Sequence, residues 1–141
     1  ASSDRYHRAV LTFPLPVIAA VQGPALAGGM DLAVMADLRL ATTAASFAHP
    51  EVLFGDVVYG PLHDLVGGAV ARDLCFTGRQ IDAHEARSVG LVTSVSEPEA
   101  FDDVVAERAA TIARGPREVL LRTKAKVLRR AGIEAGATLD L

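Results

Sequence analysis

One stretch constrains this chain more than any other: VIAAVQGPALAGGMD, from Val17 to Asp31. Its first five residues, 17–21, are continuously aliphatic and predict a short strand buried on both faces. Small residues then lead through Gly28 and Gly29 into the apolar spacing of a helix that ends near Met35. A strand that passes through glycine into a helix leaves free N–H groups at the turn, which suit an anion or a developing oxyanion. Alternatively, the two glycines only allow the strand and the helix to pack closely.

Two acidic residues follow in apolar surroundings. Asp31 lies in the first turn of the predicted helix, where it is either a charge that the helix dipole stabilises or a group of a site. Glu51 follows Pro50 and stands among aliphatic and aromatic residues, an awkward place for a hydrated side chain. We expect the two segments to face each other across one pocket. Two carboxylates in such a pocket would have their pKa values pushed apart, leaving one as base and one as acid.

Composition excludes several other classes of protein. With 141 residues, 50% hydrophobic and 22% charged, the chain suits one globular domain, and a net charge of −3 gives no reason to expect nucleic acid as a partner. The glycines are followed by no Gly-Lys-Ser/Thr and show no Gly-x-Gly-x-x-Gly spacing, which disfavours nucleotide binding. Cys75 is the single cysteine and reads as a small buried hydrophobe, so a reducing, cytoplasmic location is predicted. No apolar stretch reaches the ~18 residues that a membrane helix needs.

The remaining pattern predicts strands early in the chain and helices late. Asp82 and Glu85 form a capping box for a helix that ends at Gly90, where glycine takes the left-handed conformation. We therefore predict one α/β domain: residues 1–95 form its core, and 96–141 form a helical region of the same domain that mediates oligomer formation. The other predicted elements are helices at 4–12, 69–76, 99–113 and 116–131, strands at 38–41 and 91–95, a short turn or helix from Pro50, and a loop at 55–67.

Two long segments resemble one known family. VIAAVQGPALAGGMDLAVMADLRLATTAASFAHPEVLFG and DLCFTGRQIDAHEARSVGLVTSV, within residues 14–95, are similar to the central region of the enoyl-CoA hydratase/isomerase (crotonase) family. The resemblance implies a crotonase-like fold of repeated ββα units, here without the N-terminal units, and assembly as a homotrimer or a dimer of trimers. It also implies an acyl-CoA thioester as substrate, a place in fatty acid metabolism, and no metal or other cofactor, since CoA is part of the substrate.

The resemblance also assigns roles to residues. Gly28 would supply one N–H of the oxyanion hole, and Asp31 and Glu51 stand where hydratases have their two catalytic glutamates. The implied reaction is addition of water across the 2,3 double bond of a 2-enoyl-CoA, through an enolate that the oxyanion hole stabilises. Lower expectations of substrate contact fall on Leu26, Ala27, Tyr59 and Gly60.

The sequence departs from the family pattern in ways that leave alternatives open. No counterpart of the upstream segment with the second oxyanion-hole N–H is found, and Asp31 is one methylene shorter than glutamate. The family's dienoyl-CoA isomerases also pair aspartate with glutamate, but they add a third acid where Tyr59 stands. An isomerase, a dehydratase or hydrolase, and an acyl-CoA-binding relative with weak catalysis therefore remain as alternatives to the hydratase.

Other polar residues have weaker claims. His49 either touches substrate or, as we favour, makes a structural hydrogen bond. His63 and Asp64 are adjacent in sequence and are not expected to face each other, and His84 is expected at the surface. Leu121, Ala125 and Leu128 predict a packed face on the last helix, whose basic face is either simply solvated or attracts the phosphates of CoA. The basic residues of the two last helices are Arg108, Arg114, Arg117, Arg122, Lys124, Lys126, Arg129 and Arg130.

Overall fold

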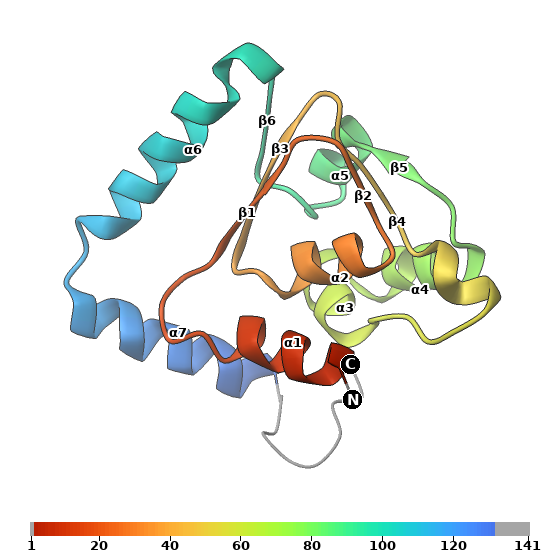
Figure 1. The fold of residues 1–141 in the computed structure, drawn as a ribbon, viewed down its shortest axis with the longest axis horizontal. Coiled ribbons are helices and arrows are strands. Elements are labelled where there is room, and N and C mark those ends of the chain that lie inside the picture. The colour runs from red at the N-terminus through yellow and green to blue at the C-terminus, as the bar shows by residue number, and fades with distance from the viewer. Residues whose placement is uncertain (1, 132–141) are drawn as a thin grey trace.

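Two small three-stranded sheets meet at an angle in the computed structural model, which describes residues 2–131 (Figure 1). In the first sheet the strand order is β1-β3-β6, and both pairings are parallel. In the second sheet the order is β2-β4-β5, with β2 and β4 parallel and β5 antiparallel to β4. The strands are β1 (Ile18–Val21), β2 (Pro24–Leu26), β3 (Leu38–Thr42), β4 (Ser46–Ala48), β5 (Ile81–Asp82) and β6 (Ser94–Ser96).

The chain twice crosses from the first sheet to the second and then enters a helix. β1 passes to β2 across residues 22–23 and continues into α2, while β3 passes to β4 across 43–45 and continues into the 3-10 helix η1. The two crossings lie side by side, because the Thr42 hydroxyl donates a hydrogen bond to the carbonyl of Gln22 at 3.0 Å. The pairing of Leu26 with Ala48 then places the start of α2 beside the start of η1. Two distant sequence segments thus meet at one edge of the second sheet.

Helices cover the angle between the sheets and extend away from it. Figure 1 shows α2 lying inside the angle, α6 leading away from β6, and α7 running back past α1. The core contains large side chains with essentially no exposure, among them Met30, Phe47, Leu62, Leu74 and Ile81. The helices are α1 (Ser2–Leu11), α2 (Gly28–Met35), η1 (Pro50–Leu53), α3 (Gly60–Val66), α4 (Gly68–Thr77), α5 (Ala83–Ser88), α6 (Pro98–Ala113) and α7 (Arg117–Ala131).

The predicted helices are all present in the described residues, but the predicted loop at 55–67 is wrong. This segment contains α3, which has Pro61 in its first turn and ends at Gly67, whose φ is 81°. Pro61 suits a helix start, and the buried Leu62 anchors the helix to the core. A helix of two turns is too short to show its apolar period in sequence, so tertiary burial decides it.

The strands depart more from expectation. β2, β4 and β5 were not predicted, because two or three residues show no period and Pro24 is a poor strand former. β1 is present but is half-buried with Ala20 exposed, so the prediction of a strand buried on both faces is wrong: among the described strands, β1 is at a sheet edge. The strand expected at 91–95 begins only at Ser94, while Leu91 and Val92 are buried before it.

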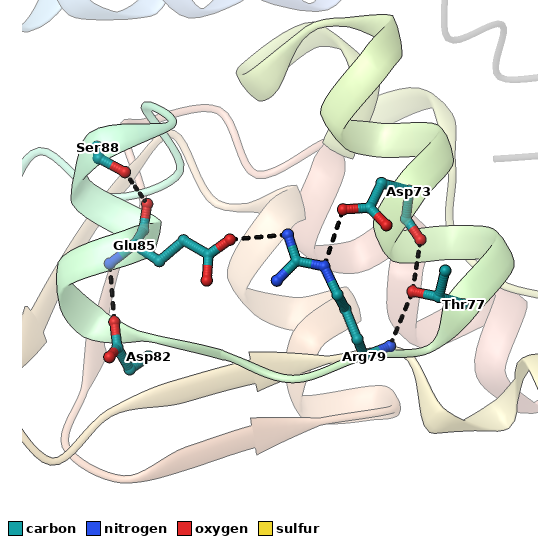
Figure 2. A network of polar contacts seen from close by, with 6 residues as sticks. All are labelled: Asp73, Thr77, Arg79, Asp82, Glu85 and Ser88. Carbon is teal, nitrogen blue, oxygen red and sulfur yellow. Dashed lines mark hydrogen bonds and ion pairs between the residues drawn. The ribbon is translucent and has the colours of Figure 1, made fainter.

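Arg79 joins α4 to α5 across β5, as Figure 2 shows. Its guanidinium donates to Asp73 at 2.8 Å and to Glu85 at 2.7 Å, and these bonds raise its pKa further. The Asp82 carboxylate accepts from the backbone N–H of Glu85 at 2.8 Å, which is one half of the predicted capping box. The other half is absent, because the Glu85 carboxylate binds Arg79 rather than the start of its own helix. Gly90 has a φ of 86°, as predicted.

The basic face of α7 is exposed except at one residue. Arg117, Arg122 and Lys126 are exposed, whereas Lys124 is buried and its ammonium lies 2.5 Å from the Asp37 carboxylate. The same carboxylate oxygen accepts a hydrogen bond from the N–H of Val17 at 2.7 Å. Lys124 is therefore a structural link between α7 and the approach to β1. None of the helices between residues 2 and 131 combines the length and the apolar character that a membrane crossing requires.

Candidate active site

The start of α2 has an unusual backbone. Ala27, the residue before the helix, has φ 51° and ψ −120°, a conformation that L residues rarely adopt and that is often found at functional sites. Two bonds hold it: its N–H donates to Ala48 at 3.1 Å, and its carbonyl accepts from the N–H of Asp31 at 2.9 Å. The N–H of Gly28 has no hydrogen-bond acceptor within residues 2–131. It is therefore a free donor at the positive end of a helix.

The surroundings of Gly28 and Gly29 decide between the two interpretations of this glycine pair. A Cβ built on either residue would meet nothing within 4 Å, and neither has a positive φ. The close-packing interpretation is therefore wrong for the described part of the chain. What the glycines keep free is the space in front of the helix start.

Glu51 is held by a tight backbone arrangement around η1. Its carbonyl accepts from the N–H groups of Phe54 and Gly55, both at 2.8 Å. Across from it, Gly78 ends α4 with a φ of 64°, and a Cβ there would lie 2.9 Å from Val52 and 3.2 Å from the carbonyl of His49. Glycine is required at residue 78 for both reasons, so the close approach of α4 fixes the segment that presents Glu51.

Asp31 and Glu51 meet on the imidazole of His49. His49 Nδ1 lies 2.9 Å from Glu51 Oε1 and 3.7 Å from Asp31 Oδ1. One ring nitrogen of His49 and one carboxylate oxygen from each acid all lie within 4.8 Å of one another. The His49 side chain is fully buried, while those of Asp31 and Glu51 are 14% and 11% exposed. His7 of α1 approaches the other side of Asp31 at 3.7 Å. The expected meeting of the two acids is thus observed, with a histidine between them.

The cluster is short of hydrogen bonds. Asp31 Oδ1, Glu51 Oε2 and His49 Nε2 are all buried without a hydrogen-bond partner in the described residues. Burial raises the pKa of Asp31, with His49 and His7 opposing the effect and Glu51 reinforcing it. Burial, and then Glu51, also raises the pKa of the nearby Cys75 to about 11, which leaves it a neutral buried thiol. Buried polar groups without partners are uncommon in structural clusters, so this one is a candidate site.

The same three residues have the donor types and the spacing that a divalent cation accepts. Two observations disfavour a metal bound through His49 Nδ1. His49 Nδ1 is already within hydrogen-bond distance of Glu51, and a metal-binding histidine normally donates its other N–H to an acceptor, which His49 Nε2 does not have among the described residues. The prediction of no metal remains a prediction.

The residues with weaker expectations of a role lie at different distances from the acidic cluster along the fold. Leu26 and Ala27 lie directly before Gly28 and beside β4, and Leu26 is 40% exposed. Tyr59 packs on the core and its ring contacts that of His63, while Gly60 begins α3. No polar contact within residues 2–131 joins Tyr59 or Gly60 to the acidic cluster. His63 and Asp64 do touch, at 3.4 Å, contrary to expectation, but both are exposed; His84 is exposed as predicted.

His49 is the residue that sequence reasoning undervalued. It was expected to make a structural hydrogen bond, and the bond that it makes is to Glu51 itself. His49 directly precedes η1 and Glu51 lies in its first turn, but the order His-Pro-Glu by itself does not predict their contact.

Comparison with known proteins identifies the family. A family model for enoyl-CoA hydratase/isomerase matches residues 2–139, nearly the whole chain. The chain belongs to the enoyl-CoA hydratase/isomerase family. It is 40% identical over 129 residues to a short-chain-enoyl-CoA hydratase of Clostridioides difficile, covering 89% of this chain and 79% of that protein.

Solved structures of the same family have a similar fold. The chain matches an enoyl-CoA hydratase of Bacillus anthracis with a TM-score of 0.85 and 30% identity, covering 93% of this chain and 52% of the other. It matches an enoyl-CoA hydratase/isomerase of Cupriavidus metallidurans with a TM-score of 0.86 and 33% identity, covering 94% and 52%. The predicted crotonase-like α/β fold is confirmed. The chain spans about half the length of several curated relatives that it matches.

Proposed function

We propose that the protein containing this chain is an enoyl-CoA hydratase, which adds water across the 2,3 double bond of a 2-enoyl-CoA thioester. One observation supports this most: two acids from different segments meet in a poorly hydrated cluster, beside a helix start with a free N–H. Neither feature is needed for packing, and together they match what thioester hydration requires.

Each group has a part in this proposal. The Gly28 N–H stabilises the oxyanion that forms on the thioester carbonyl, an effect typically worth about 2.7–4 kcal/mol for one donor. Asp31 holds a water molecule beside Glu51. Glu51 removes a proton from that water as its oxygen bonds to C3, and then returns a proton to C2 of the enolate. The atoms of one water are thereby added, and both carboxylates return to their starting state.

The wider assignments rest on family membership. Leu26, Ala27, Tyr59 and Gly60 line the acyl or pantetheine part of the ligand, and no cofactor is needed beyond the CoA of the substrate. The exposed arginines and lysines of α7 attract the CoA phosphates, and residues 96–141 mediate assembly into a homotrimer or a dimer of trimers in the cytoplasm. Figure 1 supports the last idea in one respect, since α6 extends away from the sheets.

Isomerisation of an enoyl-CoA is the second candidate. Its support is Asp31, whose raised pKa suits an acid that exchanges a proton with carbon, and the aspartate–glutamate pairing itself. Binding of acyl-CoA without turnover is the alternative from a different class.

Crotonyl-CoA tests the proposal. The polypeptide containing this chain should remove the absorbance of the conjugated enoyl thioester and form the 3-hydroxyacyl product, and Asp31→Ala and Glu51→Ala should each abolish this. Activity that survived in both variants would reject the catalytic assignment. Binding of CoA esters without any turnover would support the binding alternative, and movement of the double bond without hydration would support the isomerase.

A further inference from the structure

The imidazole of His49 is placed and restrained more closely than a packing residue requires. It lies between the end of β4 and the start of η1, with no exposure, and its carbonyl accepts from the N–H of Val52 at 3.3 Å. A Cβ built on Gly78 would lie 3.2 Å from the same carbonyl, so the end of α4 leaves this carbonyl little room to move. On this restrained segment the ring is fully buried, and its Nδ1 lies against Glu51 Oε1.

The surroundings of the ring indicate which nitrogen bears the proton. An ionised carboxylate only accepts hydrogen bonds, so a proton on Nδ1 gives the 2.9 Å contact with Glu51 a donor and an acceptor. The other tautomer would bury an N–H on Nε2, which has no acceptor in the described residues. A buried N–H without an acceptor is costly, so the Nδ1–H form is favoured.

The charged and titratable groups around this contact come from four elements. Glu51 of η1 faces Nδ1 directly, Asp31 of α2 lies at 3.7 Å, His7 of α1 lies behind Asp31, and Cys75 of α4 lies close enough to Glu51 for that carboxylate to raise its pKa. Of these contacts, only that between His49 Nδ1 and Glu51 Oε1, at 2.9 Å, has the length of a hydrogen bond.

We infer that His49 is a positioning residue for Glu51: its Nδ1–H holds Oε1, and thereby leaves Oε2 as the oxygen that exchanges protons with water and substrate. This inference rests on the proposed hydration. It assigns no bond-making step to the imidazole. The contact gives Oε2 a fixed direction.

A matched pair of variants tests the inference. The amide nitrogen of asparagine reaches about the position of histidine Nδ1, and leucine has nearly the shape of asparagine without the donor. In the polypeptide containing this chain, His49→Leu should lower kcat for crotonyl-CoA roughly 10- to 100-fold, the equivalent of a hydrogen bond to a charged group. KM should change less than about threefold, because substrate binding is untouched.

The Asn variant and a surface control complete the design. His49→Asn should recover most of the lost kcat, and His84→Leu should behave as the wild type because His84 is exposed on α5. Equal losses in His49→Leu and His49→Asn would show a merely structural role and overturn the inference. So would an unchanged kcat in His49→Leu.

A spectroscopic measurement covers the case in which the variants do not fold. Nitrogen-15 chemical shifts of His49 in the wild-type protein should report a proton on Nδ1, and Glu51→Gln should change them. A proton on Nε2, or shifts that do not respond to Glu51→Gln, would overturn the inference. If the wild type fails to hydrate crotonyl-CoA, the proposed function fails by itself, and these shifts still decide whether His49 holds Glu51.

Discussion

At the C-terminal end of α2, the buried Arg39 guanidinium donates to the carbonyls of Ala33, Ala36, Asp37 and Leu91. Nearby, Lys124 and the N–H of Val17 share one oxygen of Asp37. At the N-terminal end of the same helix, the Gly28 N–H and three side-chain atoms of the acidic cluster have no partner among the described residues. The buried charges at the C-terminal end of α2 are therefore fully hydrogen-bonded. At its N-terminal end, donors and acceptors have no partner within the described residues.

The difference shows how to separate structural from functional buried charge. Burial alone does not do so, because Arg39 is 4% exposed and His49 is not exposed at all. Burial also shifts pKa values at both ends of α2: it lowers the pKa of Arg39 to about 10 and raises the pKa of Asp31. What differs is completeness of hydrogen bonding, since a paired group stabilises the fold and an unpaired one lowers stability unless a ligand completes it.

The largest effect should come from Glu51. Glu51→Gln keeps the shape of the side chain but removes its ability to take a proton, so kcat for crotonyl-CoA should fall roughly 10²- to 10⁴-fold. The thermal midpoint should change little, because the amide oxygen of glutamine can still accept the hydrogen bond from His49 Nδ1. Glu99→Gln on the exposed start of α6 is the matched control and should keep wild-type activity. A large loss of stability in Glu51→Gln would mean that the charge at this end of α2 supports the fold, as Arg39 does at the other end.

Arg39 should give the opposite result. Arg39→Met removes the donor from three buried carbonyls and one part-buried carbonyl. It should lower the free energy of unfolding by roughly 3–5 kcal/mol, since each buried polar group left unsatisfied costs about 1–3 kcal/mol. Urea denaturation measures this, with Arg87→Met on the exposed face of α5 as control. Stability within about 0.5 kcal/mol of the wild type, the usual range for a surface change, would contradict the comparison.

Gly28→Ala should lower activity without lowering stability, and by less than Glu51→Gln. A Cβ at Gly28 meets nothing within 4 Å, so Gly28→Ala should leave stability unchanged or raise it by about 0.4–1 kcal/mol. The added methyl crowds the thioester carbonyl, and kcat/KM should fall roughly 10- to 100-fold. Gly29→Ala has equally open surroundings and should lose less activity. Equal losses in the two variants would remove the special role of Gly28.

Asp31→Asn should change stability less than Arg39→Met does, and in the opposite direction. Because folding raises its pKa, ionising Asp31 costs more in the folded state than in the unfolded state, so its charge lowers stability at neutral pH. That penalty disappears as the pH falls through the raised value toward the ordinary value of about 3.9. Asp31→Asn should therefore raise the free energy of unfolding by about 0.5–2 kcal/mol at pH 7, and the gain should shrink on acidification.

Denaturant unfolding at several pH values measures the Asp31 effect. Asp103→Asn, at an exposed position on α6, is the control and should show no such pH dependence. A loss of stability in Asp31→Asn at pH 7 that disappeared on acidification would mean that the carboxylate stabilises the fold, and would erase the difference between the two ends of the helix.

The sequence alone determined the longer helices and the identity of the acids. Long helices such as α6 and α7 repeat their apolar period several times, and glycine or proline marks their ends, so local chemistry is enough to place them. Asp31 and Glu51 were conspicuous for a similar reason, since each is a charge in an apolar stretch.

Only the tertiary structure decided what these residues meet. Strands of two or three residues and the short helix α3 exist because neighbouring segments pair with them or bury them, which no local pattern records. Arg39, Lys124 and His49 lie in stretches that do not distinguish them, yet two of them complete a structural network and the third binds Glu51. The physical reason is that hydrogen bonding of a buried charge depends on partners distant in the chain, so the sequence names the charges and the fold decides which of them remain unpaired.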